Sequence, residues 1–169
     1  YGREPRAVMV VDRSLKEIVR RHESLRTRFA ENDGAPHCVI EANPPFHLES
    51  IDLSHVPEAT REDEAVRIAI AAAREPFDLH RCPLMRAVLV RLAPETHLFS
   101  LVLHHIIADG LSLAVLGAEF RILYTAYVKG AKPALPAPTI QYADYAEWQR
   151  RWLADGALER QLAFWKHEL

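Results

Sequence analysis

The sequence predicts an α/β domain in which helices pack against a β-sheet. Three observations lead to this prediction: a hairpin signal near the amino end, a later strand that is apolar on both faces, and helices with one apolar stripe before and after that strand. Strands and helices do not alternate regularly, and the chain contains neither a GxGxxG nor a GxxxxGKS/T loop. These two facts argue against dinucleotide-binding and P-loop architectures.

The amino-terminal part of the chain carries signals for a strand, a helix and a hairpin. In order, the predicted elements are a strand over Ala7–Val11, a helix that begins at Ser14, and a hairpin whose strands Leu25–Glu31 and His37–Glu41 flank the turn Asn32-Asp33-Gly34. The helix is indicated by the capping-box spacing of Ser14 and Glu17. The hairpin is indicated by its alternating side chains and by the Asp-Gly pair, which suits the twist of paired strands.

The central part of the chain predicts three strands and two helices. These are a strand over His47–Leu53, a helix from Thr60 to Pro76, strands over Leu84–Leu92 and His97–His104, and a helix from the loop at Asp109 to Gly130. The segment Leu98–Leu103 is apolar on both faces. A strand with one solvated face would alternate, so this pattern predicts a central strand that is covered on both sides.

The last part of the chain begins with a proline-rich segment, Lys132–Pro138, that predicts an extended linker. Two helices follow, over Tyr142–Leu153 and Leu158–Leu169. Their apolar stripes include Trp148 and Trp165. Such stripes are typical of packing surfaces rather than of cofactor sites, and the sequence assigns no cofactor-binding residue.

The composition is that of an ordinary globular chain. Of its 169 residues, 49% are hydrophobic and 26% are charged, and the formal net charge is −2. No basic stripe favours nucleic acid, and no apolar run approaches the roughly 20 residues of a membrane span. We therefore expect neither a nucleic-acid partner nor a membrane partner. Residues Tyr1–Pro5 lack the charged-then-apolar pattern of a secretory leader.

The two cysteines, Cys38 and Cys82, lie far apart and have no CxxC or Cys/His spacing. We expect two free, mostly buried thiols in a reducing compartment, which predicts a cytoplasmic location. A single disulfide is the alternative. Because neither cysteine has the spacing of a zinc site, we expect no metal.

Two adjacent histidines end the predicted central strand and are the strongest candidates for chemistry. Burying a polar side chain in a strand costs free energy unless it has a hydrogen-bond partner or a function. Adjacent strand residues point to opposite faces. Only one of His104 and His105 would then face a cleft. Gly110 leaves room where the loop bends, and Asp109 is close enough to orient a ring. The same segment also suits a plain loop that enters a helix, with Asp109 or Ser112 as the cap.

A metal site made of His104, His105 and Asp109 is a weaker alternative, because adjacent strand histidines diverge. A Ser-His-Asp triad that uses Ser112 is also weak, because no GxSxG elbow surrounds the serine. From residue chemistry alone, a catalytic histidine and a structural loop are about equally good interpretations.

Three motifs, in order along most of the chain, resemble those of one enzyme family. His104–Gly110 matches the HHxxxDG pattern, Arg21–Phe29 is similar to RHExLRTxF, and Tyr142–Gln149 resembles YxDFAxWQ. Phe77-Asp78-Leu79 and Phe164-Trp165 resemble a further FDL segment and a closing aromatic pair. The chain therefore resembles the amino-terminal subdomain of a condensation domain from a nonribosomal peptide synthetase, in the chloramphenicol-acetyltransferase-like superfamily.

The resemblance implies a two-layer α/β sandwich, with helices packed on a mixed sheet, that forms one half of a pseudo-dimeric domain. Residues 1–169 would be an incomplete amino-terminal subdomain, since the family's first motif, expected before Tyr1, and its carboxy-terminal subdomain are absent from the sequence. The very short connection between the Ala7–Val11 strand and the Ser14 helix also predicts a missing segment near residues 10–13. Because the family's catalytic tunnel lies between the two halves, we expect no turnover by residues 1–169 alone.

The resemblance also implies a role for each residue of the HHxxxDG segment. His105 would act on the acceptor amine, and His104 would be structural. Asp109 would hold the loop in shape by pairing with an arginine. Gly110 would line the approach to the site.

The implied reaction is the formation of a peptide bond, in which the amine of an aminoacyl thioester attacks an acyl or peptidyl thioester. Arg21 and Arg26 would support the site without performing chemistry. No cofactor would be bound directly, because phosphopantetheine arms of carrier proteins present both substrates. The implied partners are upstream and downstream carrier domains, an adjacent adenylation domain and the carboxy-terminal subdomain.

Other functions share parts of this pattern. An epimerization domain or a stand-alone acyltransferase could carry HHxxxDG. The sequences of Arg21–Phe29 and Tyr142–Gln149, however, favour a condensation domain. A heterocyclization domain is disfavoured, because those domains carry aspartate where His104 stands. A non-catalytic docking module for carrier proteins is the alternative from another class, and the intact His105 and Asp109 argue against it.

Overall fold

The structure, a computed structural model, describes residues 6–169. Residues Tyr1–Pro5, which carry no leader pattern, lie outside the described part. The chain divides into two compact units, a first unit that ends at Ala137 and a second unit, Pro138–Leu169. The division falls at the end of the proline-rich segment that the sequence predicts to be a linker.

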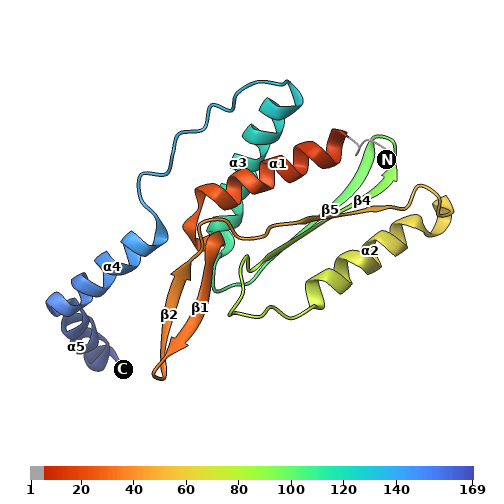
Figure 1. Ribbon diagram of the computed structural model, residues 1–169. Helices are drawn as coiled ribbons and strands as arrows, with labels where there is room; N and C mark the ends of the chain where they lie inside the picture. The colour runs from red at the N-terminus through yellow and green to blue at the C-terminus, as the bar shows by residue number, and fades with distance from the viewer. Residues whose placement is uncertain (1–5) are drawn as a thin grey trace. The chain divides into compact units, whose positions relative to one another are not determined.

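A three-stranded sheet forms the centre of the first unit (Figure 1). Its strands are β3 (Leu48–Asp52), β4 (Met85–Ala93) and β5 (Thr96–Leu103), in that order across the sheet. β3 is parallel to β4, and β5 is antiparallel to β4. The sheet is therefore mixed, as the resemblance implies.

Helices cover both faces of this sheet (Figure 1). The elements are α1 (Arg6–Arg21) and α3 (Gly110–Val128) on one face and α2 (Glu58–Arg74) on the other. β4 divides the core because its side chains alternate between the faces. Ala87 and Leu89 belong to the cluster that α1 and α3 complete, whereas Val88 and Val90 belong to the cluster that α2 completes.

The predicted strand at Ala7–Val11 is wrong, because these residues form the first turns of α1. A short apolar run fits a strand or a buried helix equally well. A longer stripe decides between them: Val8, Val11, Leu15 and Ile18 recur every three or four positions, and all four are buried in the α1–α3 cluster. Only the helix buries this whole stripe on one face.

Ser14 lies inside α1 rather than at its start, and its hydroxyl donates to the carbonyl oxygen of Val10 (2.8 Å). This bond satisfies a buried hydroxyl within the helix. Because α1 runs unbroken from Arg6 to Arg21, no strand-to-helix connection exists here. The reason for expecting a missing segment near residues 10–13 therefore falls away.

The prediction that His97–His104 is a central strand is only partly right. Both faces of β5 are covered, since Leu98 packs in the α2 cluster and Leu101 and Leu103 pack in the α1–α3 cluster. Within residues 6–169, however, β5 pairs with β4 alone and lies at the edge of the sheet. A strand's apolar pattern reports what lies above and below it, but not what lies beside it.

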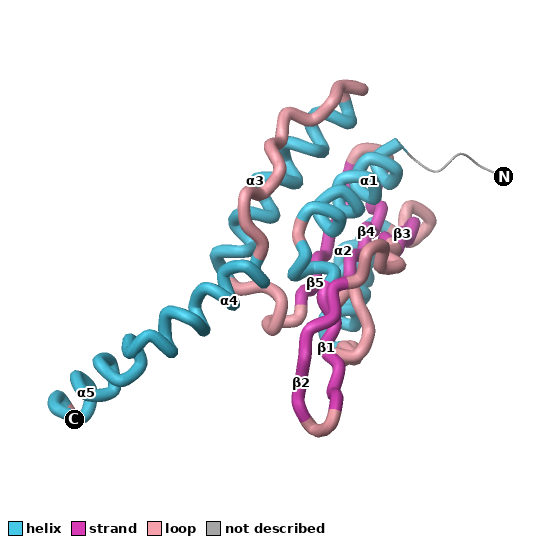
Figure 2. Tube along the Cα trace, turned by 60° about the vertical axis from the view of Figure 1, so that its left-hand side comes forward, coloured by secondary structure: helices cyan, strands magenta, loops and turns pink. Residues whose placement is uncertain are grey.

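The predicted hairpin is present as β1 (Thr27–Asn32) and β2 (Ala35–Ile40), which form a separate two-stranded sheet (Figure 2). Asp33 and Gly34 occupy the turn with φ values of 51° and 76°, which is the left-handed geometry that hairpin turns of this kind require. A 3₁₀ turn, Glu23–Arg26, joins α1 to β1, so the strand begins later than predicted.

Both cysteines are free. Cys82 is half-buried, and burial raises the pKa of its thiol. Cys38 is exposed, so the expectation of a buried thiol is wrong there. The reason is that Cys38 lies on β2, whose side chains are almost all exposed because the hairpin is not covered along that strand.

The second unit consists of α4 (Tyr142–Trp152), a turn over Leu153–Ala157 and α5 (Leu158–Glu168), in agreement with the two predicted helices. Gly156 has a φ of 84° and separates the helices. Four aromatic residues follow one another along α4 with neighbouring ring centroids 5.6 to 5.9 Å apart. They are Tyr142, Tyr145, Trp148 and Trp152.

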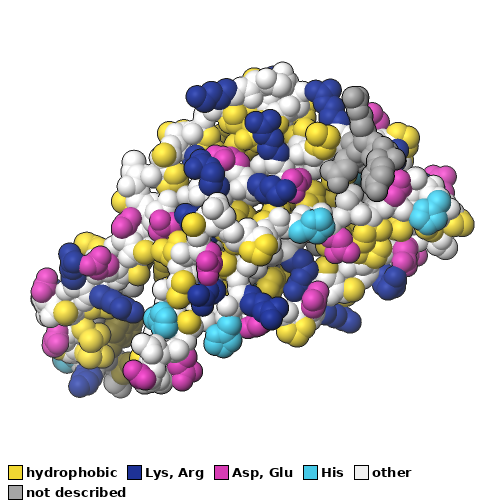
Figure 3. Space-filling model, in the orientation of Figure 1, with side chains coloured by type: hydrophobic (Ala, Val, Ile, Leu, Met, Phe, Trp, Pro, Cys, Tyr) yellow, Lys and Arg dark blue, Asp and Glu magenta, His cyan; other side chains and the backbone are white. Residues whose placement is uncertain are grey.

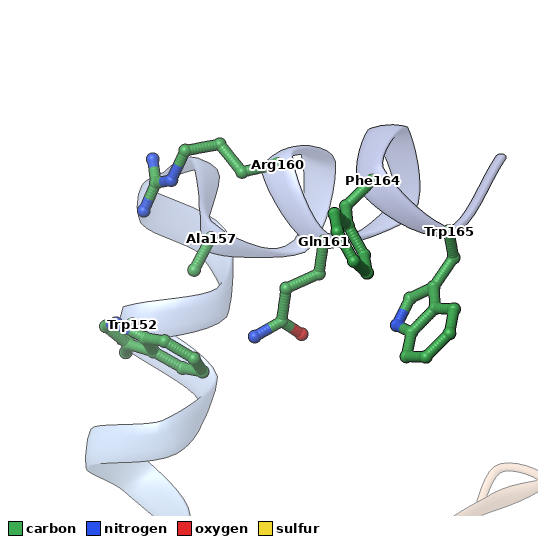
Figure 4. A pocket seen from close by; sticks show the side chains of 6 residues that line it. All are labelled: Trp152, Ala157, Arg160, Gln161, Phe164 and Trp165. Carbon is green, nitrogen blue, oxygen red and sulfur yellow. The ribbon is translucent and has the colours of Figure 1, made fainter. Parts of the chain in front are cut away.

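Aromatic rings also border a pocket of about 210 Å³ in the second unit (Figure 4). Trp152 of α4 and Phe164 and Trp165 of α5 form its apolar wall, and Arg160 and Gln161 are the polar groups on it. The three rings are exposed. This mainly aromatic wall supports the interpretation of these stripes as packing surfaces.

One helix of the described chain, α3, is long and apolar enough to cross a membrane by length and composition alone. This finding corrects the expectation that no apolar run approaches that length. Core helices of soluble proteins pass the same test. In α3, Leu116 and Leu123 are buried in the α1–α3 cluster, and Glu119 pairs with Arg21 of α1. These contacts describe a helix that packs within the first unit.

Candidate functional site

The HHxxxDG segment forms the turn between β5 and α3. β5 ends at Leu103, and the His104 N–H donates to the carbonyl oxygen of Leu84 (3.0 Å), the residue before β4. The Ile107 N–H then donates to the carbonyl oxygen of His104 (3.1 Å), which closes the turn. Ile107 is itself buried in the core. Backbone bonds and one apolar anchor therefore hold the turn against the end of the sheet.

The two histidines follow the strand instead of lying within it, which corrects the premise that strand alternation separates them. His104 is half-buried, and its Nδ1 accepts a hydrogen bond from the Ile106 N–H (3.0 Å). Its ring meets the ring of Phe77 edge-on, with centroids 6.0 Å apart. Because Nδ1 accepts, the neutral ring carries its proton on Nε2. These contacts suit the structural role that the resemblance implies for His104.

His105 lies on the open side of the same turn. Its side chain is exposed, and within residues 6–169 its imidazole makes no hydrogen bond and no ion pair. Both ring nitrogens are thus available to a substrate. The turn separates the histidines as the prediction requires, although it does so by reversing the chain rather than by strand pleating.

Asp109 is the cap of α3. Its Oδ1 accepts from the Ser112 backbone N–H (2.8 Å) and from the Ser112 hydroxyl (2.7 Å), and the Ser112 hydroxyl also accepts from the Asp109 N–H (3.1 Å). The hydrogen bonds from Ser112 lower the pKa of the Asp109 carboxyl. The implied pairing of Asp109 with an arginine is not found among the described residues, and the helix-capping alternative is correct. The capping bonds also occupy the hydroxyl of Ser112, which disfavours a triad nucleophile there.

Gly110 is the first residue of α3 and leaves open space beside the backbone. A Cβ built at this position would meet no atom within 4 Å. Its φ lies outside the left-handed region, so no backbone requirement selects glycine. The open space supports the implied role of lining an approach to the turn.

A buried charge cluster joins α1 to α3. The Arg21 Nε and Nη2 donate to the two Glu119 carboxylate oxygens (3.1 and 3.2 Å), and Arg21 Nη2 also donates to the Pro136 carbonyl oxygen (2.6 Å). The His22 Nε2 lies 2.9 Å from Glu119 Oε2. Burial alone would raise the pKa of Glu119, but the hydrogen bonds from Arg21 and His22 outweigh it and lower the pKa.

Glu119 is the residue that sequence reasoning missed. The available signal was one carboxylate on a helix stripe that otherwise contains Leu116, Phe120 and Leu123. Glu119 lies ten positions after Asp109, which is about 15 Å along a helix. Arg21 therefore supports the helix behind the turn.

Arg26 is placed differently from Arg21, although both belong to one motif. Its Nη1 donates to the carbonyl oxygen of Glu41 (2.7 Å), which ties η1 (Glu23–Arg26) to the end of β2. Its Nε is buried and has no hydrogen-bond partner in the described chain. The structure thus gathers His104, His105, Asp109 and Gly110 in one turn and leaves the two motif arginines outside it.

No group of three or more His, Cys, Asp or Glu side chains within residues 6–169 is arranged to hold a metal ion. The chemistry that this turn offers comes from an exposed imidazole on a well-anchored backbone. Such a group accepts or donates a proton near neutral pH.

Comparison with known proteins decides the family. The family model described as "Condensation domain" matches residues 6–169. The chain belongs to the condensation-domain family. One of the linear gramicidin synthase proteins from Brevibacillus parabrevis is 46% identical over 155 residues, which cover 92% of this chain and 2% of that protein.

Solved structures of condensation-domain relatives have the same fold. The SgcC5 protein from Streptomyces globisporus superposes with a TM-score of 0.80 at 29% identity, over 95% of this chain and 36% of that one. The X-domain from teicoplanin biosynthesis, solved in complex with OxyB, superposes with a TM-score of 0.79 at 31% identity, over 95% of this chain and 35% of that one. The predicted chloramphenicol-acetyltransferase-like fold is confirmed, and the chain spans about a third of each of these structures.

Proposed function

We propose that His105 acts on the acceptor amine in a condensation domain that forms an amide bond between two carrier-bound thioesters. The observation that carries this proposal is the contrast within one turn. His104 is tied to the backbone, whereas His105 is exposed. A catalytic group gains most when its backbone is held and its functional atoms are unoccupied.

The chemistry follows from the imidazole. The amine nitrogen of the acceptor attacks the carbonyl carbon of the donor thioester, and the C–S bond breaks as the thiolate leaves. The amine loses one proton, which ends on the departing thiolate to give a thiol. Either a ring nitrogen of His105 accepts this proton and passes it on, or the same nitrogen holds the amine by a hydrogen bond while the proton moves to the thiolate. An imidazole is the side chain best suited to either role at neutral pH. A thioester is already activated, so positioning supplies much of the rate.

The chain's own residues would contribute support rather than further chemistry. The Asp109 cap and the His104 contacts set the position of His105, and open space at Gly110 leaves a path to it. The phosphopantetheine arms of upstream and downstream carrier domains would deliver the substrates. An adjacent adenylation domain and the carboxy-terminal subdomain would complete the machinery, in the cytoplasm. We expect no turnover from residues 1–169 alone, because the chain spans about a third of its structural relatives.

A second candidate is a partner-binding domain without turnover. It is favoured by one comparison, since the related X-domain was solved in complex with OxyB. An epimerization domain or a stand-alone acyltransferase also remains compatible with HHxxxDG. The intact turn, with His105 unoccupied, favours catalysis over partner binding alone. The sequences of Arg21–Phe29 and Tyr142–Gln149 favour condensation over the other two activities.

The test is to incubate a complete domain that contains this chain with a loaded donor carrier and a loaded acceptor carrier, and to identify the product by mass spectrometry. The proposal predicts a carrier-bound amide product. A carrier-bound residue of inverted configuration without a new amide bond would indicate epimerization. Carrier binding with neither product would indicate the partner-binding domain and would refute the proposal.

A further inference from the structure

A second concave site lies beside the carboxy-terminal half of α1, where this helix meets the connection between β2 and β3. The pocket has a volume of about 260 Å³. Lys16 and Arg20 line it from α1, Arg26 from η1, and Asn43 from the connection. Phe46 contributes apolar wall. None of these positions belongs to the HHxxxDG turn.

The charged side chains that line this pocket are all basic. Figure 3 shows Lys and Arg side chains gathered over α1, with acidic side chains among them. Glu41 adjoins the pocket, but its carboxylate pairs with Arg28 (2.7 Å). Two further acids lie next to the pocket: Lys16 pairs with Asp12 (2.7 Å), and Arg20 pairs with Glu17 (2.8 Å). Both cations are exposed, at 55% and 68%. Pairs this exposed contribute little, so Lys16 and Arg20 are free to turn toward a ligand.

Arg26 has no carboxylate partner among residues 6–169, in contrast to Arg21. Arg21 is neutralised by Glu119, whereas the bond that Arg26 Nη1 makes is to a backbone carbonyl oxygen. Arg26 Nε is buried and unpaired within residues 6–169. A buried donor without an acceptor is unfavourable, and a guanidinium offers five N–H donors in a plane. An oxyanion in the pocket would supply the missing acceptor and the missing charge.

We propose that this pocket binds the phosphate group of a small ligand. A phosphate monoester carries a charge of about −1.5 to −2 at neutral pH, so it matches a pocket lined by three cationic side chains better than a single carboxylate does. The planar donors of Arg20 and Arg26 suit phosphate oxygens, and the Asn43 amide adds a neutral donor. The proposal does not rest on amide-bond formation, because its readout is binding.

The pocket lies at the end of the sheet from which the HHxxxDG turn leaves. β3 begins at Leu48, which pairs with Ala87 near the start of β4, and the His104 N–H bonds to Leu84 just before β4. The phosphate could therefore come from a free phosphate compound or from the phosphate of a phosphopantetheine arm. The two sources share the same chemistry at the pocket.

The test is a ¹H–¹⁵N NMR titration of the chain at constant ionic strength with inorganic phosphate, acetate, phosphopantetheine and pantetheine as separate probes. The proposal predicts saturable shifts at Lys16, Arg20, Arg26 and Asn43 with phosphate, and weaker binding of acetate. Phosphopantetheine binding tighter than inorganic phosphate would identify the arm as the source, and equal binding would identify the phosphate group alone. Saturable binding of acetate at least as tight as phosphate, or no saturable shifts, would overturn the proposal.

Substitutions in the pocket beside α1 test whether phosphate binds there. Changing Lys16 and Arg20 together to Gln should weaken phosphate binding at least about fivefold. Arg67→Gln is the matched control, because Arg67 is 68% exposed like Arg20 and pairs with Glu64 at the same helical spacing. Arg26→Lys keeps the charge, removes the Nε donor and should also weaken binding. If Arg67→Gln weakens binding as much as the double variant does, the interaction is non-specific and the assignment is wrong.

Discussion

The two sides of the turn between β5 and α3 are built in opposite ways. On the inner side, His104 accepts from a backbone N–H and packs against Phe77. Asp109 is exposed, but its carboxylate is engaged in capping the following helix. On the outer side, His105 is exposed, and its ring forms no hydrogen bond within the described chain. The motif therefore divides its polar residues between holding the backbone and facing a substrate. Variants on the two sides should therefore separate stability from activity.

The largest loss of stability is expected behind the turn, at Glu119. Glu119→Gln removes the negative charge from a cluster in which the Arg21 side chain is 6% exposed, and it replaces the carboxylate that faces a buried guanidinium with a neutral amide. We expect the free energy of unfolding at pH 7 to fall by about 3 kcal/mol, measured by urea denaturation. Glu64→Gln is the control, because Glu64 pairs with the exposed Arg67 on another helix, and it should cost at most about 0.5 kcal/mol. Equal losses would contradict the account of the buried cluster.

The same cluster should make stability depend on pH. The pKa of Glu119 is lowered from its ordinary value of 4.5, so the stability that its carboxylate contributes is present above that value and is lost as the pH falls through the lower, folded-state pKa. Glu17, whose pKa is also lowered, contributes in both proteins. We therefore predict that the difference between the original chain and Glu119→Gln shrinks between pH 5 and lower pH. A constant difference would show that the charge of Glu119 is irrelevant.

A smaller loss of stability is expected when His104 is replaced. His104→Ala removes the acceptor for the Ile106 N–H and the edge contact with Phe77, which should lower the free energy of unfolding by about 1 to 2 kcal/mol. His104→Asn places an oxygen near the position of Nδ1 and should recover part of the loss. If Ala and Asn behave alike in denaturation, the Nδ1 bond does not hold the turn.

The smallest of these losses of stability is expected at Asp109. Asp109→Ala removes the acceptor that caps α3, and the midpoint of thermal unfolding should fall by about 2 to 4 °C. Asp109→Asn keeps a capping oxygen and should stay closer to the original midpoint. A fall of similar size in both variants would point to a charge partner for Asp109 instead of a cap.

Local signals in the sequence predicted much of the fold. The Asp33-Gly34 turn and the hairpin around it follow from the backbone freedom of neighbouring residues. The start of α1 was mispredicted because five apolar residues suit a strand or a helix, and only packing with Leu15 and Ile18 decides between them. The edge position of β5 depends on which strands lie beside it, and this is a property of the whole sheet.

In the candidate site, too, the features set by neighbouring residues were predicted and those set by long-range packing were not. Resemblance to a family brought His104, His105 and Asp109 together, and the structure places them in one turn. The partner of Arg21 could not be predicted, because Glu119 is distant in the sequence and meets Arg21 only when α1 packs on α3. The cap formed by Asp109 and Ser112 was one of two open interpretations, since local spacing shows that a cap is available but not that it forms.

The most direct test of the account is His105→Ala in a complete domain, with amide formation and unfolding measured on the same protein. The account predicts that amide formation falls at least about 100-fold, while the free energy of unfolding stays within about 0.5 kcal/mol. His55→Ala, another exposed histidine, should change neither quantity. Undiminished amide formation by His105→Ala, or a rate loss matched by unfolding, would contradict the claim that His105 is the free chemical group of the turn.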